Sequence, residues 1–119
     1  MSSTSPTKIY LNPNCTKCRL SMQLLDDKGI NPEITEYLNE PPSVDELNNI
    51  LNLLSLEPRE LMRQHEAPYK ELNLANKSLG RDELIQAMVD NPILIERPII
   101  IHNGKATIGR PPEKILDIL

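Results

Sequence analysis

The beginning of the chain has the pattern of a strand, a helix and a second strand, and both cysteines lie where the first strand gives way to the helix. Residues 8–11 form a short β-like run that ends at an Asn-Pro-Asn turn. Leucines at helical spacing follow, and a glycine stands where the carboxyl end of a helix favours one. Residues 33–38 then alternate between apolar and polar side chains. This pattern predicts a strand–helix–strand unit with Cys15 and Cys18 at its first junction.

A helical stretch follows the second predicted strand. Ser43 and Glu46 have the spacing of a capping box at the start of an amphipathic helix. Residues 55–80 predict short helical pieces, with a break in the pattern at residues 67–69. Another helix is expected over about residues 81–89.

The last third of the chain changes to strand patterns. Residues 98–102 are rich in β-branched side chains, and the Asn103-Gly104 pair that follows is typical of a two-residue hairpin turn. Residues 105–108 predict the partner strand, and a final helix is expected after the prolines at 111 and 112. We therefore expect an α/β fold with a thioredoxin/glutaredoxin-like β-α-β…β-β-α core.

One domain accounts for this order of elements. A chain of 119 residues has the length of a single domain. Residues 1–7 are polar and predict a flexible tail, and residues 8–119 predict one domain. A helical insertion over about residues 43–91 is expected to separate its two halves.

Composition narrows the functional classes. The chain has three Tyr, no Phe and no Trp, and its formal net charge is −4, so it lacks both the aromatic platforms and the basic surface of nucleic-acid binders. No apolar run is long enough for a membrane span, and the polar start does not have the pattern of a secretory signal. We expect a cytoplasmic protein, and in that reducing compartment a close cysteine pair is more often redox-active or metal-binding than structural.

The position of Cys15 favours a reactive thiol. Free backbone N–H groups and the positive end of a helix dipole stabilise a thiolate, which lowers the pKa of a cysteine at a helix start. Cys18 lies one helical turn further, at a Cα separation of roughly 5.5 Å that a disulfide accepts, so it is a candidate resolving cysteine. Two alternatives remain: inert buried thiols, and half of a zinc site with His65 and His102, for which no metal-ligand spacing is present.

A set of ordered motifs carries a resemblance that extends over residues 8–119. It comprises residues 9–15 (IYLNPNC), 37–42 (YLNEPP), 61–63 (LMR), 66–74 (EAPYKELNL), 91–100 (NPILIERPII) and 109–111 (GRP). With these motifs the sequence resembles the glutaredoxin-coupled arsenate reductase family of the thioredoxin-like superfamily. The fold of that superfamily implies that Pro98 is a cis-proline beside the reactive cysteine, which brings Arg97 to the site.

The resemblance also implies a mechanism. The cysteine that follows Asn-Pro-x in this family attacks arsenate, which assigns the nucleophile to Cys15. Three arginines hold the oxyanion, and the matching residues are Arg63, Arg97 and Arg110; planar guanidinium groups suit a multiply charged oxyanion. Glutathione is the expected co-substrate and glutaredoxin the expected partner, with no bound cofactor and no metal.

Two positions differ from the family pattern and indicate alternatives. Leu11 stands where family members carry a histidine, and Cys18 stands where they typically carry a serine. The resulting C-x-x-C is consistent with a thiol–disulfide oxidoreductase or redox sensor. It also resembles the Spx-type regulators, which bind RNA polymerase, and a regulator of that type is the third function considered.

Overall fold

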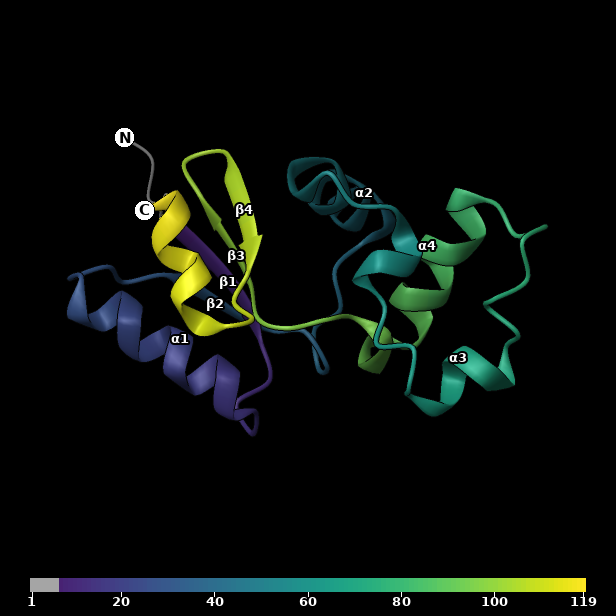
Figure 1. Cartoon of the computed structure of the whole chain (residues 1–119), viewed down its shortest axis with the longest axis horizontal. Helices are drawn as coiled ribbons and strands as arrows, with labels where there is room; N and C mark the ends of the chain where they lie inside the picture. Colours follow the sequence, from purple (N-terminus) through teal and green to yellow (C-terminus); the bar gives the residue numbers. More distant parts are fainter. Residues whose placement is uncertain (1–6) are drawn as a thin grey trace. The chain divides into compact units, whose positions relative to one another are not determined.

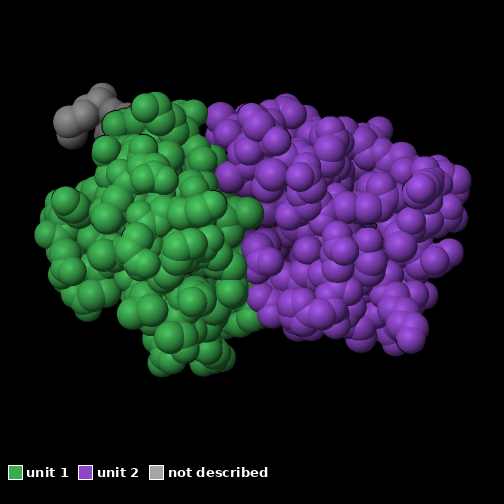
Figure 2. Space-filling view, viewed as in Figure 1, with its two compact units in different colours: residues 1–40, 97–119 green, residues 41–96 purple. Residues whose placement is uncertain are grey.

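A computed structural model describes residues 7–119, which form two compact units (Figure 2). Among the described residues, one unit consists of residues 7–40 and 97–119, and the other of residues 41–96. The second unit includes residues 43–91, where the sequence predicts a helical insertion. The tail predicted for residues 1–7 lies, up to residue 6, outside the described residues. No helix within residues 7–119 is long and apolar enough to cross a membrane.

The first unit contains a four-stranded mixed sheet with the strand order β2-β1-β3-β4. Its strands are β1 (Thr7–Leu11), β2 (Glu33–Glu36), β3 (Ile99–His102) and β4 (Lys105–Ile108). β1 pairs in parallel with β2 and antiparallel with β3, while β3 and β4 form an antiparallel hairpin. Asn103 and Gly104 connect this hairpin with positive φ angles of 49° and 81°, as a type I′ turn requires. The α/β fold expected from the sequence is therefore confirmed.

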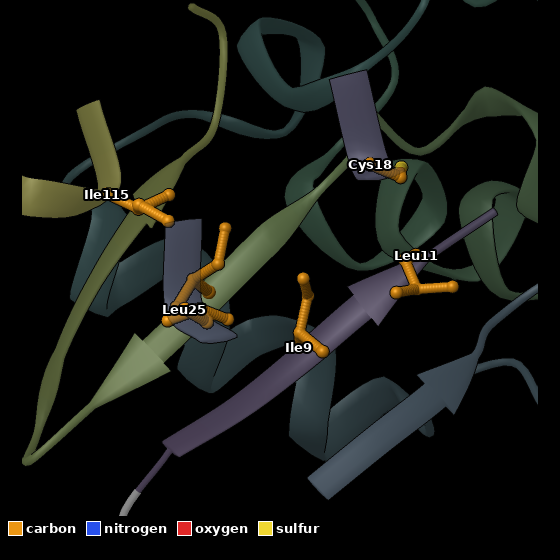
Figure 3. Packing of buried hydrophobic residues seen from close by; sticks show 6 residues of the cluster. Ile9, Leu11, Cys18, Leu25 and Ile115 are labelled. Atoms are coloured by element: carbon orange, nitrogen blue, oxygen red, sulfur yellow. The ribbon is translucent and has the colours of Figure 1, made fainter. Parts of the chain in front are cut away.

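Two helices cover one face of this sheet, α1 (Thr16–Asp27) and the 3₁₀ helix η3 (Pro112–Ile118) (Figure 1). Alternate residues of a strand point to the same face, so Ile9 and Leu11 of β1 both face these helices. Figure 3 shows their side chains directed toward those of α1 and η3. The buried cluster consists of Ile9, Leu11, Cys18, Leu25, Ile100 and Ile115. Cys18 is thus part of the aliphatic core of this unit.

The second unit is helical. It contains α2 (Val44–Leu54), the 3₁₀ helix η1 (Pro58–Leu61), α3 (Ala67–Glu71), α4 (Arg81–Asp90) and the 3₁₀ helix η2 (Pro92–Leu94). The capping box predicted at the start of α2 is present, because Ser43 Oγ accepts from the Glu46 amide at 3.1 Å and the Glu46 carboxylate accepts from the Ser43 amide at 3.4 Å. α2 and α4 contact each other through buried aliphatic side chains.

Three details of the secondary structure differ from the sequence prediction. β1 begins at Thr7, which is fully buried and was assigned to the tail. The break predicted at residues 67–69 is wrong, because α3 begins there. Pro68 lies in the first turn of the helix, where a backbone N–H would have no intrahelical acceptor, so its missing N–H does not interrupt the helix. The second strand ends at Glu36, two residues before the predicted end at 38.

Gly109 connects β4 to the loop that carries Arg110, and its backbone passes close to the start of β3. Its amide donates to the Pro98 carbonyl at 2.9 Å. A Cβ at this position would lie 2.6 Å from Ser21 Oγ and 2.9 Å from Pro98 Cγ. Glycine is therefore required here by a close approach between backbone and side chains rather than by an unusual φ angle.

We expect Gly109→Ala to lower the free energy of unfolding by about 1–3 kcal/mol, as overpacking of a well-filled site does. Chemical denaturation measures the change. The matched variant is Gly109→Ala combined with Ser21→Ala, which removes the nearer of the two clashing atoms and should recover part of the loss. A single variant as stable as the parent protein would contradict this account of the packing.

Candidate functional site

Cys15 is the N-cap residue of α1, and the turn before it holds it in place. Its backbone is extended, with φ −98° and ψ 126°. Its amide donates to the Asn12 carbonyl at 3.0 Å, and its carbonyl accepts the Arg19 amide at 3.1 Å. Asn12 also closes the turn with its side chain, because its Oδ1 accepts the Asn14 amide at 3.0 Å. The Asn-Pro-Asn sequence thus places the thiol at the amino end of the helix.

Two arginines, both from the carboxyl-terminal part of the chain, meet at this thiol. The Arg97 side chain donates a hydrogen bond to Cys15, and Arg110 Nη2 lies 3.6 Å from Cys15 Sγ. The two arginines are also connected to each other, since Arg110 Nε donates to the backbone carbonyl of Arg97 at 2.6 Å. Each precedes a proline in a cis peptide bond, Arg97–Pro98 and Arg110–Pro111. The second cis bond was not predicted from the sequence.

The surroundings of Cys15 favour its thiolate form. Partial burial raises the pKa of the thiol, but this effect is outweighed by the backbone N–H of Cys18, the Arg97 guanidinium, the Cys18 thiol and the backbone N–H of Lys17. Together they lower the pKa of Cys15 to about 7. Cys15 therefore forms its nucleophilic thiolate near neutral pH, well below the usual pKa of a cysteine.

Cys18 has the opposite character. It is 1% exposed, and its Sγ accepts the Asn12 amide at 3.5 Å. Burial, together with the negative charge of the Cys15 thiolate, raises the pKa of Cys18 to about 12 despite the hydrogen bond from Asn12. Cys18 therefore stays a neutral thiol that donates a hydrogen bond to the Cys15 thiolate.

Tyr37 is a residue near this site that the sequence analysis did not single out. It follows β2, its side chain is 1% exposed, and its hydroxyl is hydrogen-bonded to the Arg97 side chain. In the sequence its position in an alternating strand pattern indicates only a core residue. Composition offered one indication of a further role: the chain has no Phe and no Trp, so a buried Tyr, with its polar hydroxyl, is unusual in its core.

Arg63, the third predicted oxyanion ligand, belongs to the unit of residues 41–96. Its guanidinium forms ion pairs with Glu66 at 3.1 Å and with Glu96 at 3.4 Å, and its Nη2 lies 3.1 Å from His65 Nε2. Its amide donates to the Leu94 carbonyl at 2.6 Å. The role of Arg63 as an oxyanion ligand stays a prediction.

The two histidines considered as zinc ligands have other surroundings. His102 Nδ1 lies 2.6 Å from the hydroxyl of Thr7, and the His65 side chain is 69% exposed. Across residues 7–119, no three His, Cys, Asp or Glu side chains come together in a way that could hold a metal ion. The geometry therefore lends the zinc alternative no support.

We expect the rate of Cys15 alkylation by iodoacetamide to rise with pH along a single titration curve with a midpoint near pH 7, since only the thiolate reacts. Mass spectrometry of the folded protein should find the label on Cys15 and not on Cys18, whose thiol is buried and protonated. Cys15→Ser is the control and should remove the fast reaction. Equal labelling of the two cysteines at pH 7 would contradict the assignment.

Comparison with known proteins identifies the family to which the chain is similar. The sequence matches the ArsC family over residues 10–118. It is 53% identical over 117 residues to an Escherichia coli K12 protein named "Uncharacterized protein YfgD", with 98% of each chain covered. It is 47% identical over 112 residues to "Arsenate reductase" of Haemophilus influenzae, covering 93% of this chain and 97% of that protein.

A solved structure has the same fold. "Arsenate reductase from Vibrio cholerae" is 47% identical in sequence and superposes with a TM-score of 0.93, over 98% of this chain and 100% of the other. The four-stranded mixed sheet with its helices thus matches a solved arsenate reductase structure. A family match over nearly the whole length, together with relatives of this similarity, shows that the chain belongs to the ArsC family.

Proposed function

We propose that this protein is an arsenate reductase that uses glutathione as co-substrate and glutaredoxin as partner, with no bound cofactor. The observation that carries the proposal is the position of Cys15. Its thiolate lies at the amino end of a helix and is contacted by the guanidinium groups of Arg97 and Arg110. These groups offer a nucleophile and positive charge at one point, which is what attack on an oxyanion requires. Family membership and the names of the relatives support arsenate as that oxyanion.

The proposed reaction begins with nucleophilic attack. The Cys15 thiolate attacks the arsenic atom of arsenate, an As–S bond forms, and one arsenate oxygen leaves as water after protonation. A thiolate and a negatively charged oxyanion repel each other, so the charges of Arg97 and Arg110 lower the barrier to their approach. Arg63 is proposed as the third ligand of the anion because it occupies the matching position in the family's motifs.

Reduction follows when glutathione supplies the second thiol. Its sulfur bonds to Cys15 sulfur, the As–S bond breaks, and the electron pair of that bond stays on arsenic. Arsenic(V) becomes arsenic(III) and leaves as arsenite, while the two sulfurs are oxidised to a mixed disulfide. Glutaredoxin then reduces the mixed disulfide by thiol–disulfide exchange and regenerates Cys15. A reaction that consumes glutathione belongs in a reducing compartment, so we propose a cytoplasmic location.

The test is arsenate-dependent oxidation of NADPH, coupled through glutathione, glutaredoxin and glutathione reductase. We expect turnover that Cys15→Ser abolishes, because the As–S bond cannot form. Arg97→Lys and Arg110→Lys should each raise the KM for arsenate by about tenfold or more, since lysine cannot make the bidentate contact of a guanidinium. Arg63→Lys should raise it in the same way.

Arg19→Lys is the matched control for the arginine variants. Arg19 is exposed on α1, and the change keeps its charge, so KM should stay close to that of the parent protein. Arsenate-dependent turnover no higher in the parent than in Cys15→Ser would overturn the proposed function.

A second candidate function, thiol–disulfide exchange or redox sensing, is favoured by the contact between the two cysteines. Cys18 donates a hydrogen bond to the Cys15 thiolate, so the two sulfurs are neighbours. Peroxide would oxidise Cys15 to a sulfenic acid with release of water, and Cys18 sulfur would then displace the hydroxyl group as a second water while the disulfide forms.

We expect mild peroxide treatment to convert both free thiols into one internal disulfide, which thiol counting and a loss of two hydrogens in the intact mass would measure. In Cys18→Ser no internal disulfide can form, and the oxidised Cys15 should instead react with added glutathione. Two thiols that remain free, or disulfides only between molecules, would rule out an internal pair as the function.

A further inference from the structure

Tyr37 is fixed in a way that leaves its hydroxyl little freedom. Its side chain is 1% exposed, so the ring is held on all sides by the surrounding protein. A buried tyrosine hydroxyl needs a hydrogen-bond partner, and for Tyr37 the Arg97 guanidinium provides one. The Arg97 N–H donates and the Tyr37 oxygen accepts, because a guanidinium has no acceptor.

Arg97 is the residue through which the parts of the site are connected. Its side chain donates to Cys15, and its backbone carbonyl accepts from Arg110 Nε at 2.6 Å. The backbone after it is held by the hydrogen bond from the Gly109 amide to the Pro98 carbonyl. An arginine side chain is long and flexible, so a fixed backbone alone does not fix where its guanidinium lies. A rigid second contact is needed at the guanidinium itself.

We propose that Tyr37 is a positioning residue for the reaction at Cys15: its buried hydroxyl holds the Arg97 guanidinium against the Cys15 sulfur and ready for the incoming oxyanion. Tyr37 acts through Arg97 and does not need to touch the substrate. The part of the proposal that concerns the oxyanion rests on the proposed function, whereas the effect on Cys15 can be measured without any substrate.

The first test is Tyr37→Phe, which keeps the buried ring and removes the hydroxyl. With Arg97 less well held, we expect the midpoint of Cys15 alkylation to rise by about 0.5 pH unit, so that the rate at pH 7 falls about twofold. The KM for arsenate should rise more than kcat falls, because a guanidinium that is not pre-positioned binds the anion less well. Tyr10→Phe is the matched control, since it removes the same group from another buried tyrosine of the same unit and should leave the alkylation midpoint unchanged.

A double-mutant cycle with Arg97→Lys separates positioning from a merely structural role. If Tyr37 acts through the Arg97 guanidinium, the shift in the midpoint of Cys15 alkylation caused by Tyr37→Phe should largely disappear in the Arg97→Lys background. The same shift in both backgrounds, or no shift from Tyr37→Phe in the parent protein, would overturn the proposal.

The experiments distinguish a failure of the proposed function from a failure of the positioning role of Tyr37. If the parent protein does not reduce arsenate but Tyr37→Phe still shifts the alkylation midpoint in an Arg97-dependent way, the proposed function is wrong and the positioning of Arg97 by Tyr37 stands. If arsenate is reduced and the midpoint does not move, the positioning is wrong and the proposed function stands.

Discussion

The rest of the site depends on one constraint: the Cys15 thiolate has to be stabilised in a partly buried position. Burial alone would keep Cys15 protonated and unreactive at neutral pH, so the fold has to supply compensating groups. It draws them from parts of the chain that are far apart in sequence: backbone N–H groups and the Cys18 thiol from the start of α1, and the Arg97 guanidinium from the segment before β3. Arg110, from the loop after β4, contacts the same sulfur. The sheet brings these parts together, because β1 pairs directly with β3.

The two cysteines show how strongly the surroundings determine the pKa of a thiol. Cys15 lies at the open amino end of a helix, and Cys18, one turn later, points into an aliphatic core. The same side chain therefore has a pKa of about 7 in one place and about 12 in the other. Leu11, at the position where the resemblance implies a histidine, is buried in the core cluster with Cys18, and the groups that lower the pKa of Cys15 are backbone N–H groups, the Arg97 guanidinium and the Cys18 thiol.

Much of this architecture could be predicted from local sequence signals, and the parts that could not are those set by contacts over long distances. The capping box at Ser43, the hairpin turn at Asn103-Gly104 and the helix start at Cys15 each follow from a few neighbouring residues. The role of Tyr37 depends on a contact with a residue sixty positions away, which no local pattern encodes. The start of α3 at Ala67 was missed because a proline was taken as a helix breaker where it begins the helix.

The hydrogen bond from Arg110 to the backbone carbonyl of residue 97 has a consequence for how such a site can change over evolutionary time. A main-chain acceptor is present whatever side chain residue 97 carries, so Arg110 keeps its anchor when that side chain is replaced. The two cations are therefore separable: one can be lost or exchanged while the other remains beside the thiol.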